Sequence, residues 1–118
     1  YGALDCSLVS AIHPFYTASI REFEEAGRPI LGSAPVGTEG TDDWIESVGE
    51  ILNIKKNMIS TCKNEIIPKI KEGLKLNKIK GTITLSGYEG SELLVARLLT
   101  ESGAKIPYVG TACPKTKW

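Results

Sequence analysis

The chain has 118 residues, of which 42% are hydrophobic and 24% are charged, a composition typical of a folded globular domain. Its 14 basic residues balance 14 acidic ones, so no net positive charge is available to bind nucleic acid. No apolar run approaches the roughly 20 residues that span a bilayer, and the three cysteines are too few for a disulfide scaffold. We therefore expect a cytoplasmic protein without a transmembrane segment. Because it begins at Tyr1 and not at methionine, we expect an internal fragment of a longer subunit.

The charge is distributed unevenly along the chain. Residues 1–50 carry nine acids against two arginines, a net charge of −7. Residues 51–80 carry eight lysines against two glutamates, a net charge of +6. A lysine-rich helix is most often a solvated face, and a docking surface for an acidic partner is the alternative.

Residues 1–40 predict a first βαβ unit and a loop. The apolar run at residues 8–12 ends at a His-Pro pair, as a short buried strand would. The spacing of apolar residues predicts a helix over 17–26, and a second short strand at residues 30–31 follows. Glycine, serine and proline in residues 32–40 indicate a loop.

Residues 41–80 predict a helical segment. Thr41 is the expected N-cap of its first helix, which extends to about residue 52. A second helix is expected over about 58–74, where Pro68 should kink or divide it because proline removes a helix hydrogen bond. Cys62 lies on the apolar stripe of this helix and is expected in the core.

Residues 81–118 predict a second βαβ unit. The alternating run at 81–86 indicates a strand, Ser91 is the expected cap of a helix, and residues 105–109 form the next strand. Two such units joined by helices predict an α/β fold of open, mainly parallel, Rossmann-like sheet units with flanking helices, in which all three segments belong to a larger subunit.

Ligands of open parallel sheets bind beyond the carboxyl ends of the strands, which here are followed by four loops of small, polar and aromatic residues. Such loops suit a cavity for a large flat ligand and also suit ordinary turns. The substrate-binding candidates in these loops are His13, Phe15, Tyr16, Ser33, Ser86 and Tyr88.

Three residues are weak catalytic candidates. His13, the only histidine, is either a hydrogen-bonded structural residue or a donor to a ligand in the cavity. Tyr88 could line a cavity or fill space, as could Tyr16 and Tyr108. Glu89 could donate a proton or be an exposed turn residue. No serine or cysteine nucleophile is linked to His13 by spacing.

The spacing of glycines and cysteines does not support a dinucleotide site or a metal site. Only two of the three glycines of a dinucleotide fingerprint follow the strand at residues 81–86. Cys6, Cys62 and Cys113 are far apart in the sequence and form no C-x-x-C pair. We predict no metal site in this chain, since an iron–sulfur cluster needs about four thiolates.

Four longer runs resemble a known family. They read AIHPFYTASIREFE at residues 11–24, GSAPVG at 32–37, LSGYEGSELLVAR at 85–97 and PYVGTACP at 107–114. They resemble the Y-subunit family of the chlorophyllide a reductases, within the nitrogenase component-1 superfamily. The similarity covers essentially the whole chain, and the lysine-rich helix is among its variable parts.

The resemblance implies a middle piece of a subunit that pairs with a homologous subunit Z as a heterotetramer. An ATP-hydrolysing iron–sulfur protein, subunit X, would use ATP-Mg and deliver electrons. The complex would contain a [4Fe-4S] cluster whose ligands lie mainly upstream of this chain. The implied reaction reduces the C7=C8 bond of ring B of a chlorophyllide, in bacteriochlorophyll biosynthesis. The fragment alone is expected to be inactive.

One implication concerns position. In nitrogenase, the loop after the strand that corresponds to residues 8–12 carries the cysteine that holds the catalytic cofactor. Here that loop contains His13 and no cysteine, so we expect His13 and its neighbours to face a tetrapyrrole cavity. The alternatives are a related protochlorophyllide reductase subunit and a non-enzymatic α/β ligand-binding module.

Overall fold

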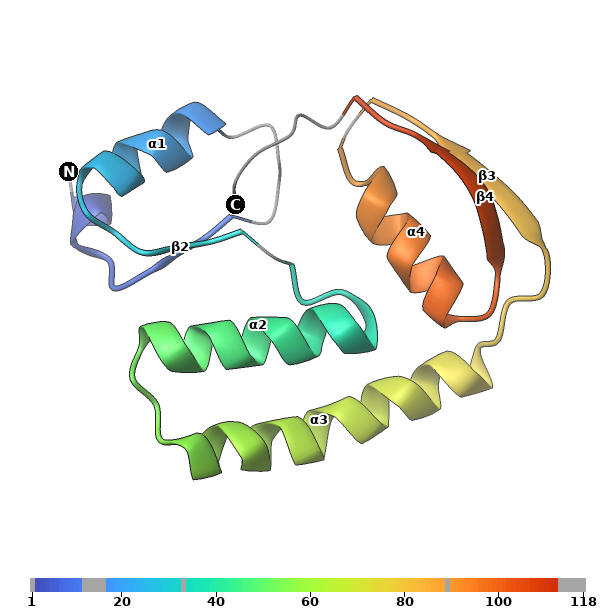
Figure 1. The fold of residues 1–118 in the computed structure, drawn as a ribbon, viewed down its shortest axis with the longest axis horizontal. Helices are drawn as coiled ribbons and strands as arrows, with labels where there is room; N and C mark the ends of the chain where they lie inside the picture. The colour runs from blue at the N-terminus through green and yellow to red at the C-terminus, as the bar shows by residue number, and fades with distance from the viewer. Residues whose placement is uncertain (1, 12–16, 33, 89, 113–118) are drawn as a thin grey trace.

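The structure is a computed structural model that describes residues 2–11, 17–32, 34–88 and 90–112. The strands and α-helices follow one another in the order expected from the sequence, with two consecutive helices in the middle, and a short 3₁₀ helix that was not predicted precedes them (Figure 1). The elements are a 3₁₀ helix Gly2–Asp5, β1 Val9–Ser10, α1 Thr17–Glu25, β2 Ile30–Leu31, α2 Gly37–Ile51, α3 Lys56–Leu76, β3 Thr82–Ser86, α4 Glu92–Glu101 and β4 Lys105–Gly110.

The strands form parallel pairs, which confirms the α/β prediction. β1 pairs with β2 so that Val9 lies opposite Ile30. β3 pairs with β4 and ends with Ser86 opposite Gly110. Within the described ranges, the pairs form two separate two-stranded sheets, with α1 and α4 as the crossover helices (Figure 1).

α2 begins at Gly37 with Val36 in the N-cap position, five residues before the predicted cap, so Thr41 is not its N-cap. Thr41 is buried inside the helix, and the first turn is capped from elsewhere. The carboxylate of Glu101, at the end of α4, accepts hydrogen bonds from the backbone N–H groups of Thr38 and Glu39. Residues 37–40, which were predicted as part of a loop, thus form the first turn of a helix that is capped by a carboxylate from a distant helix.

α3 corrects two further predictions. Of the two outcomes predicted at Pro68, a kink or a division, the division does not occur, because α3 is one continuous helix there (Figure 1). Pro68 is exposed, so water can solvate the carbonyl that loses its partner. Cys62 is exposed and not in the core, because the apolar groove that it lines between α2 and α3 is open.

At the N-terminal end of α4, the serine predicted as its cap does not act as one. Ser91 occupies the N-cap position, but its side chain makes no capping hydrogen bond. Its φ of −84° and ψ of −6° are helical and not extended. An N-cap hydroxyl reaches the backbone of the next turn from extended dihedral angles, so the conformation explains the missing bond.

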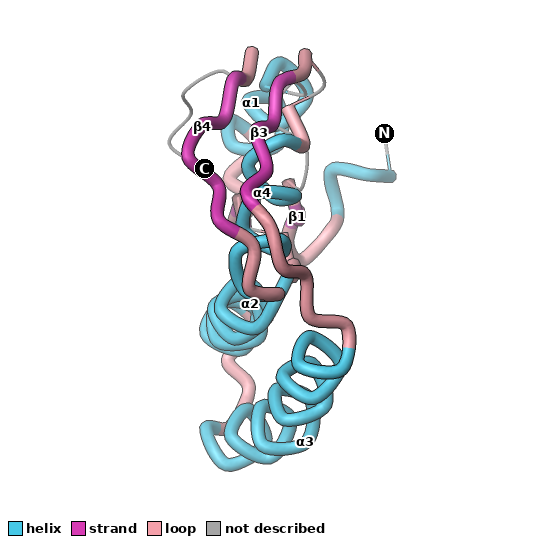
Figure 2. The backbone as a smooth tube through the Cα atoms, turned by 90° about the vertical axis from the view of Figure 1, so that its right-hand side faces the viewer, coloured by secondary structure: helices cyan, strands magenta, loops and turns pink. Residues whose placement is uncertain are grey.

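The described residues form a thin slab with a small core. The extents are 46 × 37 × 19 Å, and the radius of gyration is 16.3 Å. A separate domain of this length would have a radius of gyration of about 13.5 Å. Figure 2 shows the slab edge-on. The buried apolar residues are Ile20, Leu31, Ala34, Ile59 and Ala104.

Large apolar side chains remain at the surface of this slab. Leu52, Met58 and Leu76 are all exposed. No helix within the described ranges is sufficiently long and apolar to cross a membrane.

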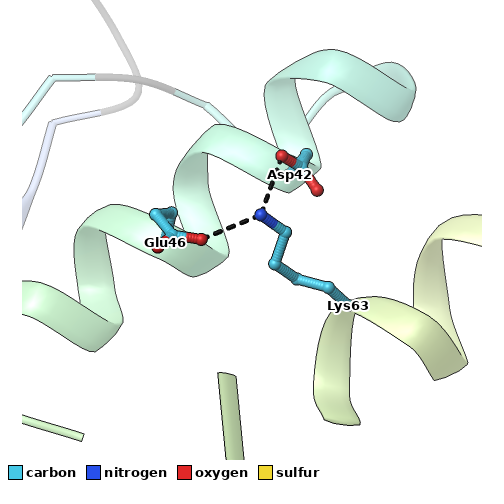
Figure 3. Close-up of polar contacts among 3 residues, drawn as sticks. All are labelled: Asp42, Glu46 and Lys63. Atoms are coloured by element: carbon cyan, nitrogen blue, oxygen red, sulfur yellow. Dashed lines mark hydrogen bonds and ion pairs between the residues drawn. The ribbon is translucent and has the colours of Figure 1, made fainter. Parts of the chain in front are cut away.

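An ion-pair cluster joins α2 to α3. The Lys63 ammonium of α3 lies 3.0 Å from an Asp42 oxygen and 2.8 Å from a Glu46 oxygen, both on α2 (Figure 3). The hydrogen bonds to Glu46 and then to Asp42 raise the pKa of Lys63 above its ordinary value of 10.5. Lys63 is therefore held in its charged form in the folded chain.

This cluster predicts a pH dependence of stability. Because folding raises the pKa of Lys63, its stabilising contribution is complete below 10.5 and is lost as pH rises through the higher folded value. We expect a Lys63→Met variant of the full-length subunit to melt at a lower temperature than wild type at neutral pH. The two melting temperatures should converge at a pH above the shifted pKa.

Lys69→Met is the matched control. Lys69 contacts one carboxylate, Glu65, in an exposed pair on a single helix, at 3.2 Å. Its replacement should change the melting temperature less than replacement of Lys63. Equal effects of the two variants at every pH would contradict a specific role for the Lys63 cluster.

Candidate functional site

The carboxyl ends of β3 and β4 bring two predicted loops together. Ser86 and Gly110 lie opposite each other at the last pair of the sheet. Beyond them, the Gly87 N–H donates a hydrogen bond to the Gly110 carbonyl at 3.1 Å. Tyr88 and Thr111 follow directly. We call Ser86, Gly87, Tyr88, Gly110 and Thr111 the strand-tip edge.

A buried carboxylate holds the two loops of the strand-tip edge in place. Glu92, in the first turn of α4, is only 8% exposed. Its Oε2 accepts a hydrogen bond from Thr111 Oγ1 at 2.8 Å. A Cβ added at Gly87 would lie 2.4 Å from Glu92 Oε1, so a larger residue there would displace this carboxylate. Sequence reasoning did not place Glu92 in the site. Its position in the first turn of a helix, where the helix dipole stabilises a carboxylate, is the feature that could have indicated it.

The outer surface of the strand-tip edge carries aromatic rings and hydroxyl groups. Tyr88 is 86% exposed and Tyr108 is 60% exposed. A Cβ added at Gly110 would lie 3.0 Å from the Tyr108 hydroxyl and 3.1 Å from Ser86 Oγ. The two hydroxyls therefore lie on the same side of the edge, over the bare backbone of Gly110. Such a surface can stack against a flat ring and donate hydrogen bonds to its substituents.

Of the predicted site residues, Ser86 and Tyr88 lie together at this edge. The remaining ones lie outside the described residues, so their roles stay predictions. They are His13, Phe15, Tyr16, Ser33 and Glu89, and Cys113 lies outside as well.

The described residues do not by themselves supply a complete iron–sulfur cluster site. Among the residues that the structure describes, no group of three or more His, Cys, Asp or Glu side chains could hold a metal ion. Cys6, just after the 3₁₀ helix, and Cys62, on α3, are both free thiols. The full sequence contains three cysteines, and a cluster requires about four thiolates.

Comparison of the sequence with known proteins places this chain in a family. Residues 3–118 match the family model described as nitrogenase component 1 type oxidoreductase, and the chain belongs to that family. It is 57% identical over 118 residues to proteins named chlorophyllide reductase 52.5 kDa chain from Rhodobacter capsulatus and from Cereibacter sphaeroides. That alignment covers 100% of this chain and 24% of either relative.

The chain is also similar, at lower identity, to a second kind of reductase subunit. The chain is 28% identical over 103 residues to a light-independent protochlorophyllide reductase subunit N from Prochlorococcus marinus. Here 83% of this chain and 25% of the relative are aligned. The chain thus spans about a quarter of the length of the curated relatives it matches. No solved structure matched it.

Proposed function

We propose that this chain is part of subunit Y of a nitrogenase-like, ATP-dependent chlorophyllide a reductase. The reaction reduces the C7=C8 bond of ring B in bacteriochlorophyll biosynthesis. The supporting observation is the 57% identity along the whole chain to relatives named chlorophyllide reductase. The identity to the relative named as a protochlorophyllide reductase subunit is 28%, about half as high.

The proposed division of labour assigns electron delivery to other parts of the complex. Reduction of a C=C bond consumes two electrons and two protons and leaves a CH–CH bond. We propose that the iron–sulfur ATPase subunit X supplies the electrons, and that a [4Fe-4S] cluster is held outside this chain. Subunit Z completes the cytoplasmic heterotetramer. This chain then binds the macrocycle and fixes its orientation.

The strand-tip edge is the proposed contribution of this chain to the pigment chamber. Tyr88 offers an exposed ring for stacking, and Ser86 offers a hydroxyl beside it. Glu92 keeps the loop of Thr111 fixed against the turn at Gly87. His13 and Glu89 are proposed, from their positions in the sequence, as further groups that face the pigment.

The reaction is tested by reconstituting the full-length subunit with subunits X and Z, ATP and a reductant. Chlorophyllide a and protochlorophyllide are supplied separately, and each is followed by absorbance. We expect consumption of chlorophyllide a that requires both ATP and subunit X. Consumption of protochlorophyllide alone would identify the related reductase. Binding of pigment without any reduction would favour a non-enzymatic module.

The role of the strand-tip edge predicts a binding defect. Tyr88→Ala in the complete complex should raise KM for the pigment about two- to tenfold, because one ring–ring contact is lost. The kcat should change less, since the electron donor is untouched. Met58→Ala removes another exposed apolar side chain, on α3, and should leave KM unchanged. An unaltered KM in Tyr88→Ala and in His13→Ala would remove the support for this chamber wall.

A further inference from the structure

An open cleft of about 640 Å³ lies away from the strand-tip edge. Three elements converge on it: the first turns of α2, the C-terminal half of α3 and the end of α4 (Figure 1). Ile67 and Leu74 of α3 contribute apolar surface to the cleft. Its basic residues are Lys71, Lys75 and Lys78, and its acidic residues are Glu39, Asp42 and Glu101.

The cleft is separate from the proposed pigment wall. Its residues at and just after the end of α4, Glu101 to Gly103, come just before β4 and therefore lie at the amino end of that strand. Ser86 and Gly110 lie at the carboxyl ends of β3 and β4. Because the two strands are parallel, these are opposite edges of the sheet. An occupant of the cleft would therefore not compete with a ligand at the strand tips.

Two of the three acids in the cleft are already engaged within the chain. Asp42 pairs with Lys63 at 3.0 Å. Glu101 accepts backbone N–H groups at the start of α2. Glu39, on α2, is the third acid of the lining. The lining therefore holds three lysines and three acids, and its positive charge is concentrated on the wall formed by α3 and the residues just after it.

The lysines form a row along the helix. Lys71 and Lys75 are four residues apart and so lie on one face of α3, and Lys78 continues this row beyond its last turn. None of the three makes an ion pair with any residue in the described part of the chain. Like charges at this spacing repel each other. An anionic partner would turn that repulsion into attraction.

The end of the row is held in place by packing. A Cβ added at Gly103 would lie 3.3 Å from Cε of Lys78, so the stem of this lysine covers the glycine. The neighbouring Ile79 N–H donates to the Ser102 carbonyl at 2.9 Å. The connection after α3 is therefore fixed to the end of α4. The cleft walls are tied together before any partner binds, which lowers the entropy cost of docking.

We propose that this cleft docks an acidic amphipathic segment of a partner polypeptide. Apolar side chains of the segment would contact Ile67 and Leu74, and its carboxylates would pair with Lys71, Lys75 and Lys78. The inference depends on the contents of the cleft and not on the proposed reaction. It assigns a partner surface to the lysine-rich helix and leaves the strand-tip edge free for pigment.

Carbodiimide cross-linking of the purified native assembly tests the occupant. This reagent joins a lysine amine to a carboxylate through an amide, with loss of water, only where the two groups are in contact. We expect cross-links from Lys71, Lys75 or Lys78 to Asp or Glu residues of a second polypeptide. Cross-links of these lysines only to carboxylates of the same subunit would overturn the proposal, as would no cross-links at all.

Charge reversal provides the matched variants. The pair Lys71→Glu and Lys75→Glu in the full-length subunit should weaken partner association about tenfold at low salt, and less at high salt. The control pair Lys55→Glu and Lys56→Glu changes two exposed lysines at the other end of α3 and should not weaken it. Equal association of both pairs would contradict the proposal. If charge reversal disturbs folding, Lys71→Met and Lys75→Met keep apolar side chains of nearly the same length without the charge and should still weaken association.

Discussion

Replacing Ile59 by alanine is expected to lower the free energy of unfolding by about 2–4 kcal/mol, the largest effect of a single substitution in this chain. Ile59 of α3 is 7% exposed and packs against the bare backbone of Gly49 on α2. A Cβ added at Gly49 would lie 2.3 Å from its Cδ1, which shows how closely the helices approach. The isoleucine side chain fills a space that alanine would leave empty.

Hydrogen exchange in the full-length subunit measures this loss locally. Amides of α2 and α3 should exchange faster in Ile59→Ala, whereas those of β3 and β4 should change little. Met58→Ala is the control, because the neighbouring Met58 side chain is 59% exposed. Similar exchange in both variants would show that Ile59 does not hold the helix pair together.

The second large effect concerns the start of α2. There we expect Gly37→Ala to lower the free energy of unfolding by about 2–3 kcal/mol. Gly37 has a φ of +70°, a conformation that strains a residue with a side chain. A Cβ there would also lie 2.7 Å from the Glu101 carboxylate that caps the helix. Alanine would therefore add backbone strain and displace the cap.

A double-mutant cycle separates these two causes. In a Glu101→Ala background the cap is already absent, so Gly37→Ala should add only the strain. Gly27→Ala supplies the strain alone, because Gly27 has a φ of +74° and nothing within 4 Å of its added Cβ. The readouts are the melting temperature and exchange of the Thr38 and Glu39 amides. Strict additivity of Gly37→Ala and Glu101→Ala would exclude the proposed contact.

Local patterns were sufficient to predict most of the elements. Alternation of apolar and polar residues identified β3, whose bounds are Thr82–Ser86. Helical spacing and glycine placement identified α1 and α4 closely. These signals lie within the segment that forms the element, so they can be recognised without knowledge of the tertiary contacts.

Two of the wrong predictions, at Thr41 and Cys62, depend on contacts between distant residues. The cap on α2 comes from Glu101, 63 residues after Thr38, and no local pattern indicates that contact. Cys62 lies on an apolar stripe, but whether a stripe is buried depends on what covers it, and the groove beside it is open. Propensity within a segment cannot supply either fact.

For the candidate site, topology was more informative than motifs. The rule that parallel strands end at one edge agrees with the pairing of Ser86 with Gly110, whereas the roles of Ser86 and Tyr88 in binding stay predictions. The buried Glu92 that fixes this edge was not predicted, because in the sequence it resembles an ordinary exposed helix-start carboxylate. Its burial follows from the close approach of Gly87 and from Thr111, both set by the fold.

The most direct test is a structure of the full assembly, purified with its partner subunits and with bound chlorophyllide. The account predicts that the macrocycle lies against the strand-tip edge, with the Tyr88 ring in contact with it and Ser86 within hydrogen-bonding distance of a substituent. Pigment bound elsewhere, with Tyr88 and Ser86 covered by protein or water, would contradict it.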